Sequence, residues 1–445
     1  MEIVIIGGIA AGMSVAAKAS RTNKEANITV IEKESFVSFG ACGLPYYLGD
    51  QFDDQGEMFS RTPEQMEKSG INLLLEHEVT QVDFTQKIIR FTDLKSGESK
   101  TKSYDRLMIA TGAQPIVPPI PGIDSSNVYT ITKPEPVKEL KERLPEIQKV
   151  VVIGGGFIGV EVAEQLRHQG KEVTLVEADT KIMGGPFDPE FSDRLAMAIE
   201  EAGVQVHLEE RAEQFVTDGD RVTSVKTNKG EYTADVVIVA IGFRPNTKFL
   251  AGQIEMLGNG AIIADAYGQT SIPDVFAAGD CATVPHRLSG DIYLPLATMA
   301  NKMGRLIGTN IAVENPEERV AFPGTLGSSA IKAGEYEAFS TGVTEKQANN
   351  LGLDFKTTTI ETNNHSNYYT VQEKIMIKLI YDAKTYVLYG AQMFGKNETV
   401  LRGTGLTTAI HAGLTTKELG FVDYAYAPPF ASTWEAINVA ANTAK

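Results

Sequence analysis

The sequence has few of the residues that several classes of protein require. Only two of its 445 residues are cysteines, so a disulfide framework of the kind that holds small secreted domains together is excluded. The formal net charge of −16 makes nucleic acid and anionic membranes unfavourable partners. No apolar run reaches the roughly 18 residues that a membrane-spanning helix needs. The start, MEIVIIGG, has no targeting pattern, so we expect a cytoplasmic protein.

Glycine, by contrast, is abundant, with 41 residues that gather in short runs after apolar stretches. Such runs are typical of tight backbone turns against a ligand. Two of them lie inside the same strand–turn–helix–strand pattern, which is the unit of nucleotide-binding α/β domains. The elements of the two units are expected at 3–6, 12–20 and 28–32, and again at 150–153, 160–169 and 173–177.

The second glycine turn, GGGFIG, matches the dinucleotide-binding fingerprint. Gly154 permits the tight turn, Gly156 lets the backbone approach a pyrophosphate, and Gly159 lets the helix and the strand pack closely. Glu177 ends the next strand, where a carboxylate accepts hydrogen bonds from ribose hydroxyls and repels a 2′-phosphate. No arginine follows at once, so NADH is favoured, while Lys181 leaves NADPH open.

The first turn, GGIAAG, departs from the fingerprint because Ile9 replaces its second glycine. Gly7 and Gly12 keep the outer positions, and Glu32 follows at the distance expected for a ribose partner. A hydride taken from a nicotinamide needs an acceptor in the same protein, so this turn is predicted to bind FAD. On its own it also fits an ordinary strand-to-helix crossover.

Three short runs after apolar strands extend the predicted cofactor sites. ATG and AIG each end a strand with a turn of small residues, and the aspartate of AAGD is suited to bind a ribityl hydroxyl. Each run alone also fits an ordinary turn, but their order along the chain favours cofactor contacts. We assign these contacts to Thr111, Gly112, Gly242 and Asp280. No metal centre is expected.

Cys42 lies in SFGACGLPYY, where glycine and alanine neighbours leave room for a group to approach its sulfur. If a helix begins there, its N-terminus favours the thiolate. No C-x-x-C pair exists and Cys281 is expected to be structural, so Cys42 would cycle through a mixed disulfide with a small thiol or through a sulfenic acid. The alternative is an inert buried cysteine.

These patterns predict an α/β protein with two Rossmann-like dinucleotide-binding domains and a further strand-and-turn element over 262–280. From about Phe322 the chain becomes rich in Thr, Tyr and β-branched residues, with alternating strands over 375–381 and 387–394, which indicates a separate α+β domain. The expected domains are a discontinuous FAD-binding domain at 1–118 and 244–321, an NAD(P)H-binding domain at 119–243, and the C-terminal domain at 322–445.

The chain resembles the single-cysteine branch of the pyridine nucleotide–disulfide oxidoreductase family, which includes coenzyme A-disulfide reductases, CoA-persulfide reductases, NADH oxidases and NADH peroxidases. The resemblance rests on the FAD-type turn followed in order by SFGACGLPYY, ATGAQP, GGGFIG, AIGFRPN, VFAAGD and AYAPPF. It implies a glutathione-reductase-like fold and a homodimer joined through the C-terminal domain. It also implies reduction of CoA disulfide or CoA persulfide through a Cys42–S–S–CoA mixed disulfide.

The resemblance further assigns roles to single residues. Peroxidases and water-forming oxidases carry a histidine where this chain has Ala10, which argues against peroxide or oxygen as the acceptor. Tyr426, with Tyr368, matches tyrosines that approach the cysteine from the other subunit in CoA-disulfide reductases; interface packing is their alternative role. Because CoA is polyanionic, it needs local cations and polar groups. The resemblance places its site at Lys18, Arg21, Ser38, Arg61 and Asn301, and adds Trp434 near the C-terminus.

Two other functions stay open at this point. One is an NADH oxidase that reduces oxygen, with Cys42 as a sulfenic acid. The other is a non-catalytic redox-sensing flavoprotein that acts through a partner.

Overall fold

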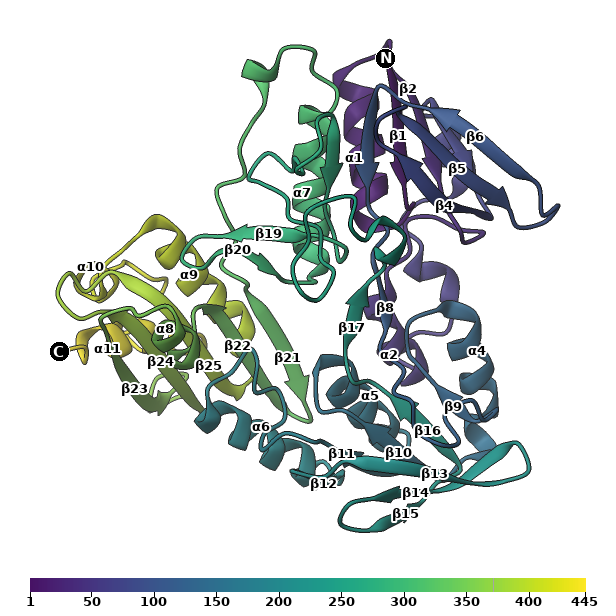
Figure 1. Cartoon of the computed structure of the whole chain (residues 1–445). Helices are drawn as coiled ribbons and strands as arrows, with labels where there is room; N and C mark the ends of the chain where they lie inside the picture. Colours follow the sequence, from purple (N-terminus) through teal and green to yellow (C-terminus); the bar gives the residue numbers. More distant parts are fainter. Residues whose placement is uncertain (371) are drawn as a thin grey trace. The chain divides into compact units, whose positions relative to one another are not determined.

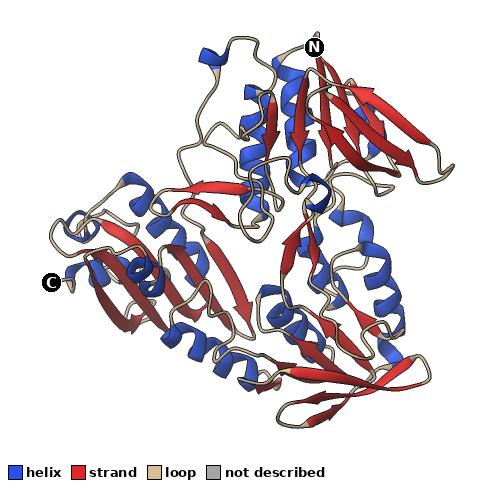
Figure 2. Ribbon diagram, viewed as in Figure 1, coloured by secondary structure: helices blue, strands red, loops and turns tan. Residues whose placement is uncertain are grey.

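The computed structural model describes residues 1–370 and 372–445. These residues form two compact units, each assembled from separate stretches of chain (Figure 1). Both units contain helices and strands, so the chain is a mixed α/β protein (Figure 2). The first unit comprises Met1–Gly43, Asp54–Ile116 and Phe243–Thr325, and the second comprises Leu44–Asp53, Val117–Gly242 and Leu326–Lys445.

A five-stranded parallel sheet of order β18-β7-β1-β2-β3 lies in the first unit. Its strands are β1 (Glu2–Ile6), β2 (Asn27–Ile31), β3 (Ile71–Leu74), β7 (Arg106–Ile109) and β18 (Val275–Ala277). β7 is buried along its whole length, and β1 and β2 are buried after their first residues. Continuous burial is what parallel strands covered on both faces require. The two strands predicted at the N-terminus are confirmed.

Two helices of the first unit, α1 (Ala10–Thr22) and α7 (Ala297–Asn310), pack side by side (Figure 1). Glycine makes this close approach possible, since a Cβ at Gly304 of α7 would lie 2.6 Å from the carbonyl oxygen of Ala11. The helix predicted after the first glycine turn is confirmed and extends beyond its predicted range at both ends.

Smaller elements complete the first unit. They are α3 (Pro63–Glu67), the antiparallel sheet of β4 (His77–Asp83), β5 (Ile88–Asp93) and β6 (Ser99–Ser103), and the strand pairs β8 (Ala113–Pro115) with β17 (Phe243–Pro245) and β19 (Thr283–His286) with β20 (Gly290–Tyr293). The strand-and-turn element predicted over 262–280 is present, with β18 as its strand. Residues 262–274 form turns and isolated bridges, because Gly268, at φ +80°, interrupts extended backbone.

The second unit repeats the nucleotide-binding pattern in a parallel sheet of order β12-β11-β10-β16-β9. α5 (Phe157–His168) starts within the second glycine turn and joins two neighbouring strands, so the predicted second unit is confirmed. The strands are β9 (Val128–Tyr129), β10 (Lys149–Ile153), β11 (Glu172–Val176), β12 (Gln205–His207) and β16 (Val236–Val239). The other elements before residue 243 are α2 (Leu44–Leu48), α4 (Pro134–Arg143), α6 (Pro189–Glu201), β13 (Ala212–Asp218), β14 (Arg221–Thr227) and β15 (Glu231–Thr233).

The C-terminal part of the second unit is an antiparallel sheet of order β21-β22-β25-β24-β23 with helices beside it. The strands are β21 (Ser329–Ala333), β22 (Tyr336–Gly342), β23 (Phe355–Asn363), β24 (Lys374–Asp382) and β25 (Leu388–Lys396). The helices are α8 (Glu345–Asn350), α9 (Thr399–Ala412), α10 (Thr416–Leu419) and α11 (Ala436–Asn442). Both predicted strands are confirmed, but their alternation is not: every residue from Ile375 to Tyr381 in β24 is buried.

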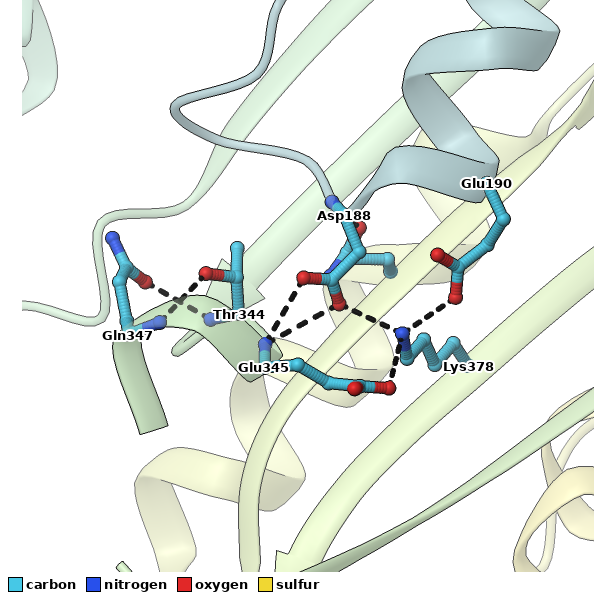
Figure 3. A network of polar contacts seen from close by, with 7 residues as sticks. Asp188, Glu190, Thr344, Glu345, Gln347 and Lys378 are labelled. Carbon is cyan, nitrogen blue, oxygen red and sulfur yellow. Dashed lines mark hydrogen bonds and ion pairs between the residues drawn. The ribbon is translucent and has the colours of Figure 1, made fainter. Parts of the chain in front are cut away.

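One of these buried residues is Lys378, which is 2% exposed. Figure 3 shows its ammonium among three carboxylates, with Nζ 2.9 Å from Asp188, 2.5 Å from Glu190 and 2.6 Å from Glu345. The three carboxylates are close enough together to ligate a metal ion, but the lysine ammonium lies among them. The network joins the starts of α6 and α8 to β24.

Candidate active site

The first glycine turn follows β1 and is tied to the acid at the end of β2. Gly7 has φ +100°, and a Cβ there would lie 2.2 Å from the carbonyl oxygen of Ala110, so only glycine fits. A Cβ at Gly12 would lie 1.9 Å from the carbonyl oxygen of Gly7. Glu32 accepts hydrogen bonds from the backbone of Gly8 and, at 2.8 Å, of Glu34. Burial raises the pKa of Glu32.

The predicted FAD contacts gather at one edge of the parallel sheet. Thr111 and Gly112 follow β7, and Asp280 follows β18, which pairs with β7 in parallel. Strands β7 and β1 are also parallel neighbours, so these residues share the carboxyl edge with the first glycine turn. In open α/β sheets this edge is where nucleotides bind.

Two polar side chains at this edge fit a bound cofactor. The hydroxyl oxygen of Thr111 is buried and has no hydrogen-bond partner among the described residues. Burial raises the pKa of Asp280, whose carboxyl group lies mostly out of water. Buried polar groups are costly without partners. The ribityl and phosphate groups of FAD would supply them, so Thr111, Asp280 and the Gly7–Gly12 turn are the residues that could hold this cofactor.

Cys42 is exposed, in the short 3₁₀ helix Ala41–Gly43. The segment before it is fixed to the first glycine turn, because the backbone N–H of Ser38 donates to the carbonyl of Gly8 at 3.0 Å. Gly40 N–H donates to the carbonyl of Met58 at 2.8 Å, which holds the other side of the segment. The thiol therefore reaches solvent from a backbone that is anchored to the predicted FAD turn.

Cys281 differs from Cys42 in its access to solvent. Its side chain is fully buried, and its Sγ lies 3.5 Å from the carbonyl oxygen of Ile109. Burial raises the pKa of Cys281 to about 11, so the thiolate is rare near neutral pH. These observations leave Cys42 as the accessible thiol of the chain.

The second glycine turn has the same geometry as the first. A Cβ at Gly154, which has φ +108°, would lie 2.4 Å from the carbonyl of Ala240, and one at Gly159 would lie 1.9 Å from the carbonyl of Gly154. Beside Gly156 there is open space, as a pyrophosphate requires. Gly242, after β16, has φ +104°.

Glu177 closes the second turn as Glu32 closes the first. It accepts from the backbone of Gly155 at 2.6 Å and of Asp179 at 2.7 Å. The ammonium of Lys181, the cation nearest in sequence, forms an ion pair with Asp193. This pairing satisfies the charge that a 2′-phosphate would otherwise use.

The residues assigned to CoA in the first unit fall into two local groups. Lys18 and Arg21 lie on α1 and Asn301 on α7, and Ser14 of α1 donates to the side chain of Asn301 at 2.9 Å. Ser38, at φ +56°, accepts a hydrogen bond at its carbonyl from the backbone N–H of Ser60 at 3.1 Å. Arg61 follows Ser60 in the chain. Trp434 lies in the second unit, 54% exposed, with its ring edge-to-face against Phe421.

Tyr368 and Tyr426 meet in the second unit. Their hydroxyl oxygens are 2.7 Å apart, and the side chains are 73% and 44% exposed. The hydrogen bond to Tyr426 lowers the pKa of Tyr368, and the same bond raises the pKa of Tyr426. The pair thus combines a more acidic phenol with a less acidic one.

The sequence analysis did not single out Glu161, a partly buried acid of the second unit. Glu161 lies on α5 just past the fingerprint, and Tyr46 of α2 donates to its carboxylate at 3.3 Å. Burial raises the pKa of Glu161 to about 7. The two residues are far apart in sequence, so the only local signal for this contact was a carboxylate next to the glycine turn, on a helix with one buried face.

Comparison with known proteins identifies the relatives of this chain. The sequence profile of pyridine nucleotide-disulphide oxidoreductases matches residues 1–304, and that of their dimerisation domain matches residues 329–437. The chain belongs to this family. Pyridine nucleotide-disulphide oxidoreductases are flavin-dependent, and the chain is accordingly an oxidoreductase that binds FAD and NAD(P)H.

Individual relatives in the family differ in their named activities. An NADH oxidase of Enterococcus faecalis is 35% identical over 446 residues, which cover 100% of this chain and 99% of the oxidase. An NAD(P)H coenzyme A polysulfide/persulfide reductase of Pyrococcus horikoshii is 35% identical over 452 residues, which cover 100% of this chain and 98% of the reductase. The structure of a water-forming NADH oxidase from Lactobacillus brevis bound to NADH matches with a TM-score of 0.94 at 33% identity, covering 99% of this chain and 97% of that one.

Equal identity to an oxidase and to a reductase means that the family alone does not choose the electron acceptor. None of the helices in the described part of the chain has the length and apolar character to cross a membrane.

Proposed function

We propose that this protein is an NADH-dependent reductase of CoA disulfide or CoA persulfide that works through Cys42. The proposal rests mainly on the contrast between the two cysteines. Cys42 is exposed beside the first glycine turn, whereas Cys281 is fully buried. Because the other cysteine of the chain, Cys281, is fully buried, Cys42 suits a substrate that itself brings a sulfur. The Pyrococcus horikoshii relative, named for that activity, supports the proposal.

The chemistry at Cys42 is thiol–disulfide exchange. FAD, when bound, supplies the two-electron relay between NADH and sulfur. The Cys42 thiolate attacks one sulfur of CoA disulfide, so a Cys42–S–S–CoA bond forms while the substrate S–S bond breaks. Two electrons then reduce this mixed disulfide to the Cys42 thiolate and a second CoA thiol. One NADH, one proton and one CoA disulfide give NAD⁺ and two CoA thiols.

The tyrosine pair protonates the departing CoA thiolate. In the proposed homodimer, Tyr426 and Tyr368 of one subunit act at Cys42 of the other. A hydrogen-bonded pair of phenols suits this role, because the bond from one hydroxyl makes the other a better donor. Their exposure leaves them accessible to a second copy of the chain.

The remaining assignments follow from the same proposal. Lys18, Arg21, Ser38, Arg61, Asn301 and Trp434 bind CoA. Glu177 and the ion-paired Lys181 favour NADH over NADPH. The family's dimerisation profile over residues 329–437 supports a homodimer, and we place the protein in the cytoplasm.

A second function is an NADH oxidase that reduces oxygen, with Cys42 as a sulfenic acid. The Enterococcus faecalis relative, which matches over the whole chain, favours it. Ala10 argues against this oxidase function, because the chain then lacks the histidine that oxidases carry at this position.

The proposal is tested by replacing each cysteine in turn. Cys42→Ser should retain bound FAD but lose at least about 1,000-fold in NADH-dependent reduction of CoA disulfide, because serine cannot form the mixed disulfide. Cys281→Ser serves as the matched control and should keep both. Undiminished CoA disulfide reduction by Cys42→Ser would refute the mechanism. Flavin absorbance and thiol release, measured on the same samples, provide the two readouts.

A further inference from the structure

Arg402 of α9 forms a largely buried ion pair that has no part in the chemistry above. Its Nε lies 2.6 Å from the carboxylate of Glu435, and the two side chains are only 11% and 8% exposed. Taking two such charges out of water costs several kcal/mol unless the geometry is good and further hydrogen bonds are made. Arg402 makes two further bonds through Nη2, while its Nη1 is buried with no hydrogen-bond partner among the described residues.

The same guanidinium joins two stretches of backbone. Its Nη2 donates to the carbonyl of Asn364 at 3.0 Å and to the carbonyl of Phe430 at 2.7 Å. The first carbonyl precedes Tyr368 in the chain, and the second follows Tyr426. Arg402 is therefore a bridge between the two segments that carry the tyrosine pair.

Two serines form hydrogen bonds between the same two segments. Ser366 Oγ donates to the carbonyl of Ala431 at 3.0 Å, and Ser432 Oγ donates to the carbonyl of His365 at 3.2 Å. Two direct hydrogen bonds and the two bonds from Arg402 thus link residues 364–366 with residues 430–432. Glu435 also caps α11, since its carboxylate accepts from the backbone of Ile437.

The tyrosine hydroxyls themselves lie at the surface, where a hydrogen bond alone holds two side chains weakly. Ordering an exposed side chain costs entropy comparable to the roughly 1 kcal/mol that one such bond returns. The 2.7 Å contact between Tyr368 and Tyr426 therefore depends on the backbone that presents them.

We propose that Arg402, held by Glu435, is a positioning residue that sets the hydrogen bond between Tyr368 and Tyr426. The planar guanidinium is needed because it reaches two carbonyls and one carboxylate at once, whereas a lysine ammonium is a single point charge. The consequence for turnover rests on the proposed role of the tyrosines; the structural claim does not.

The test compares Arg402→Met and Arg402→Lys with Arg194→Met as the matched control. Arg194 lies in the same unit and pairs with Glu361 at 2.7 Å, but both of these side chains are about 40% exposed. Full-length, FAD-loaded protein labelled with ¹³Cζ-tyrosine is titrated by NMR without substrate, and Tyr368→Phe and Tyr426→Phe assign the two signals. Steady-state kcat and KM are measured on the same samples with CoA disulfide.

In the parent and in Arg194→Met, the two phenols should titrate as a coupled pair. In Arg402→Met they should titrate independently, and kcat with CoA disulfide should fall at least about 10-fold with KM for NADH unchanged, as expected when a proton donor is misplaced. Arg402→Lys should recover part of the loss. If Arg402→Met does not fold, Glu435→Gln, which keeps an acceptor at the α11 cap, provides the same comparison.

Coupled titration that persists in folded Arg402→Met, or in Glu435→Gln where that variant replaces it, would overturn the inference. If Arg402→Met uncouples the phenols while the two tyrosine-to-phenylalanine variants keep full turnover, positioning by Arg402 stands and the proposed proton donation fails. If the tyrosine variants lose turnover while Arg402→Met leaves both titration and kcat intact, the proposed function stands and the inference fails.

Discussion

One carboxylate accepts hydrogen bonds from the backbone at each glycine turn. Glu177 is held by backbone N–H groups of Gly155 and Asp179 at the place where a nucleotide ribose would lie. Glu177→Gln should reduce the preference for NADH, because the neutral amide no longer repels a 2′-phosphate. The ratio of kcat/KM for NADH to kcat/KM for NADPH should fall about 10- to 100-fold, or roughly 1.4–2.8 kcal/mol.

The matched control for this change is Glu172→Gln, at the exposed first residue of the same strand. Steady-state assays with both nucleotides should give it the parent ratio. A Glu177→Gln ratio equal to that of the parent would show that another residue sets the nucleotide preference.

Glu161 makes stability depend on pH. Burial raises its pKa to about 7 from the usual 4.5, so the folded chain binds this proton more tightly than the unfolded chain does. The resulting stabilisation is complete below about pH 4.5 and is lost as the pH rises through 7. Glu161→Gln removes the titration, so the variant should gain on the parent by a few kcal/mol at most between pH 5.5 and pH 8.

Urea unfolding of the FAD-loaded parent and variant at both pH values measures this difference. Glu32 and Asp280, whose pKa values burial also raises, titrate in both proteins and cancel in the comparison. Parallel pH profiles for the parent and Glu161→Gln would contradict the account.

At the scale of elements, Lys378 fastens two helices to β24. Replacing it with methionine leaves Asp188, which is 2% exposed, near Glu190 and Glu345 without a cation (Figure 3). We expect Lys378→Met to lower the free energy of unfolding by about 3–5 kcal/mol, which is the cost of removing one partner from a buried ionic network. Lys384→Met is the control, because the Lys384 side chain is 82% exposed and pairs with Asp354 at 3.0 Å. Such surface pairs contribute about 0–1 kcal/mol to stability. Equal urea midpoints for the two variants would rule out this role.

The elements that the sequence predicted well are those with local signals. Apolar runs such as 150–153, together with the glycine turns that follow them, determine a strand, a turn and a helix from residues that are close in sequence. The alternation predicted for 375–381 failed because the sheet is covered on both faces, and the carboxylates that make burial of Lys378 tolerable come from distant parts of the chain. The contacts of Glu161 and Arg402 could not be predicted either, because their partners also lie far away in the sequence.

At the scale of the whole molecule, the family and its FAD and NAD(P)H cofactors follow from motifs that the sequence displays in order. The assignment of single site residues and the three-domain division at 1–118 with 244–321, 119–243 and 322–445 stay predictions. In the proposed mechanism the acceptor is set by what reaches Cys42 in the assembled protein, and among local patterns only Ala10 bears on it. Relatives with 35% identity accordingly include both an oxidase and a persulfide reductase.

The most direct test of the central claim is NADH consumption by the purified protein without oxygen, with CoA disulfide or CoA persulfide added, compared with air alone. The account predicts turnover that requires the CoA substrate and continues anaerobically. Turnover that requires air and is indifferent to the CoA substrate would contradict it and would establish an NADH oxidase.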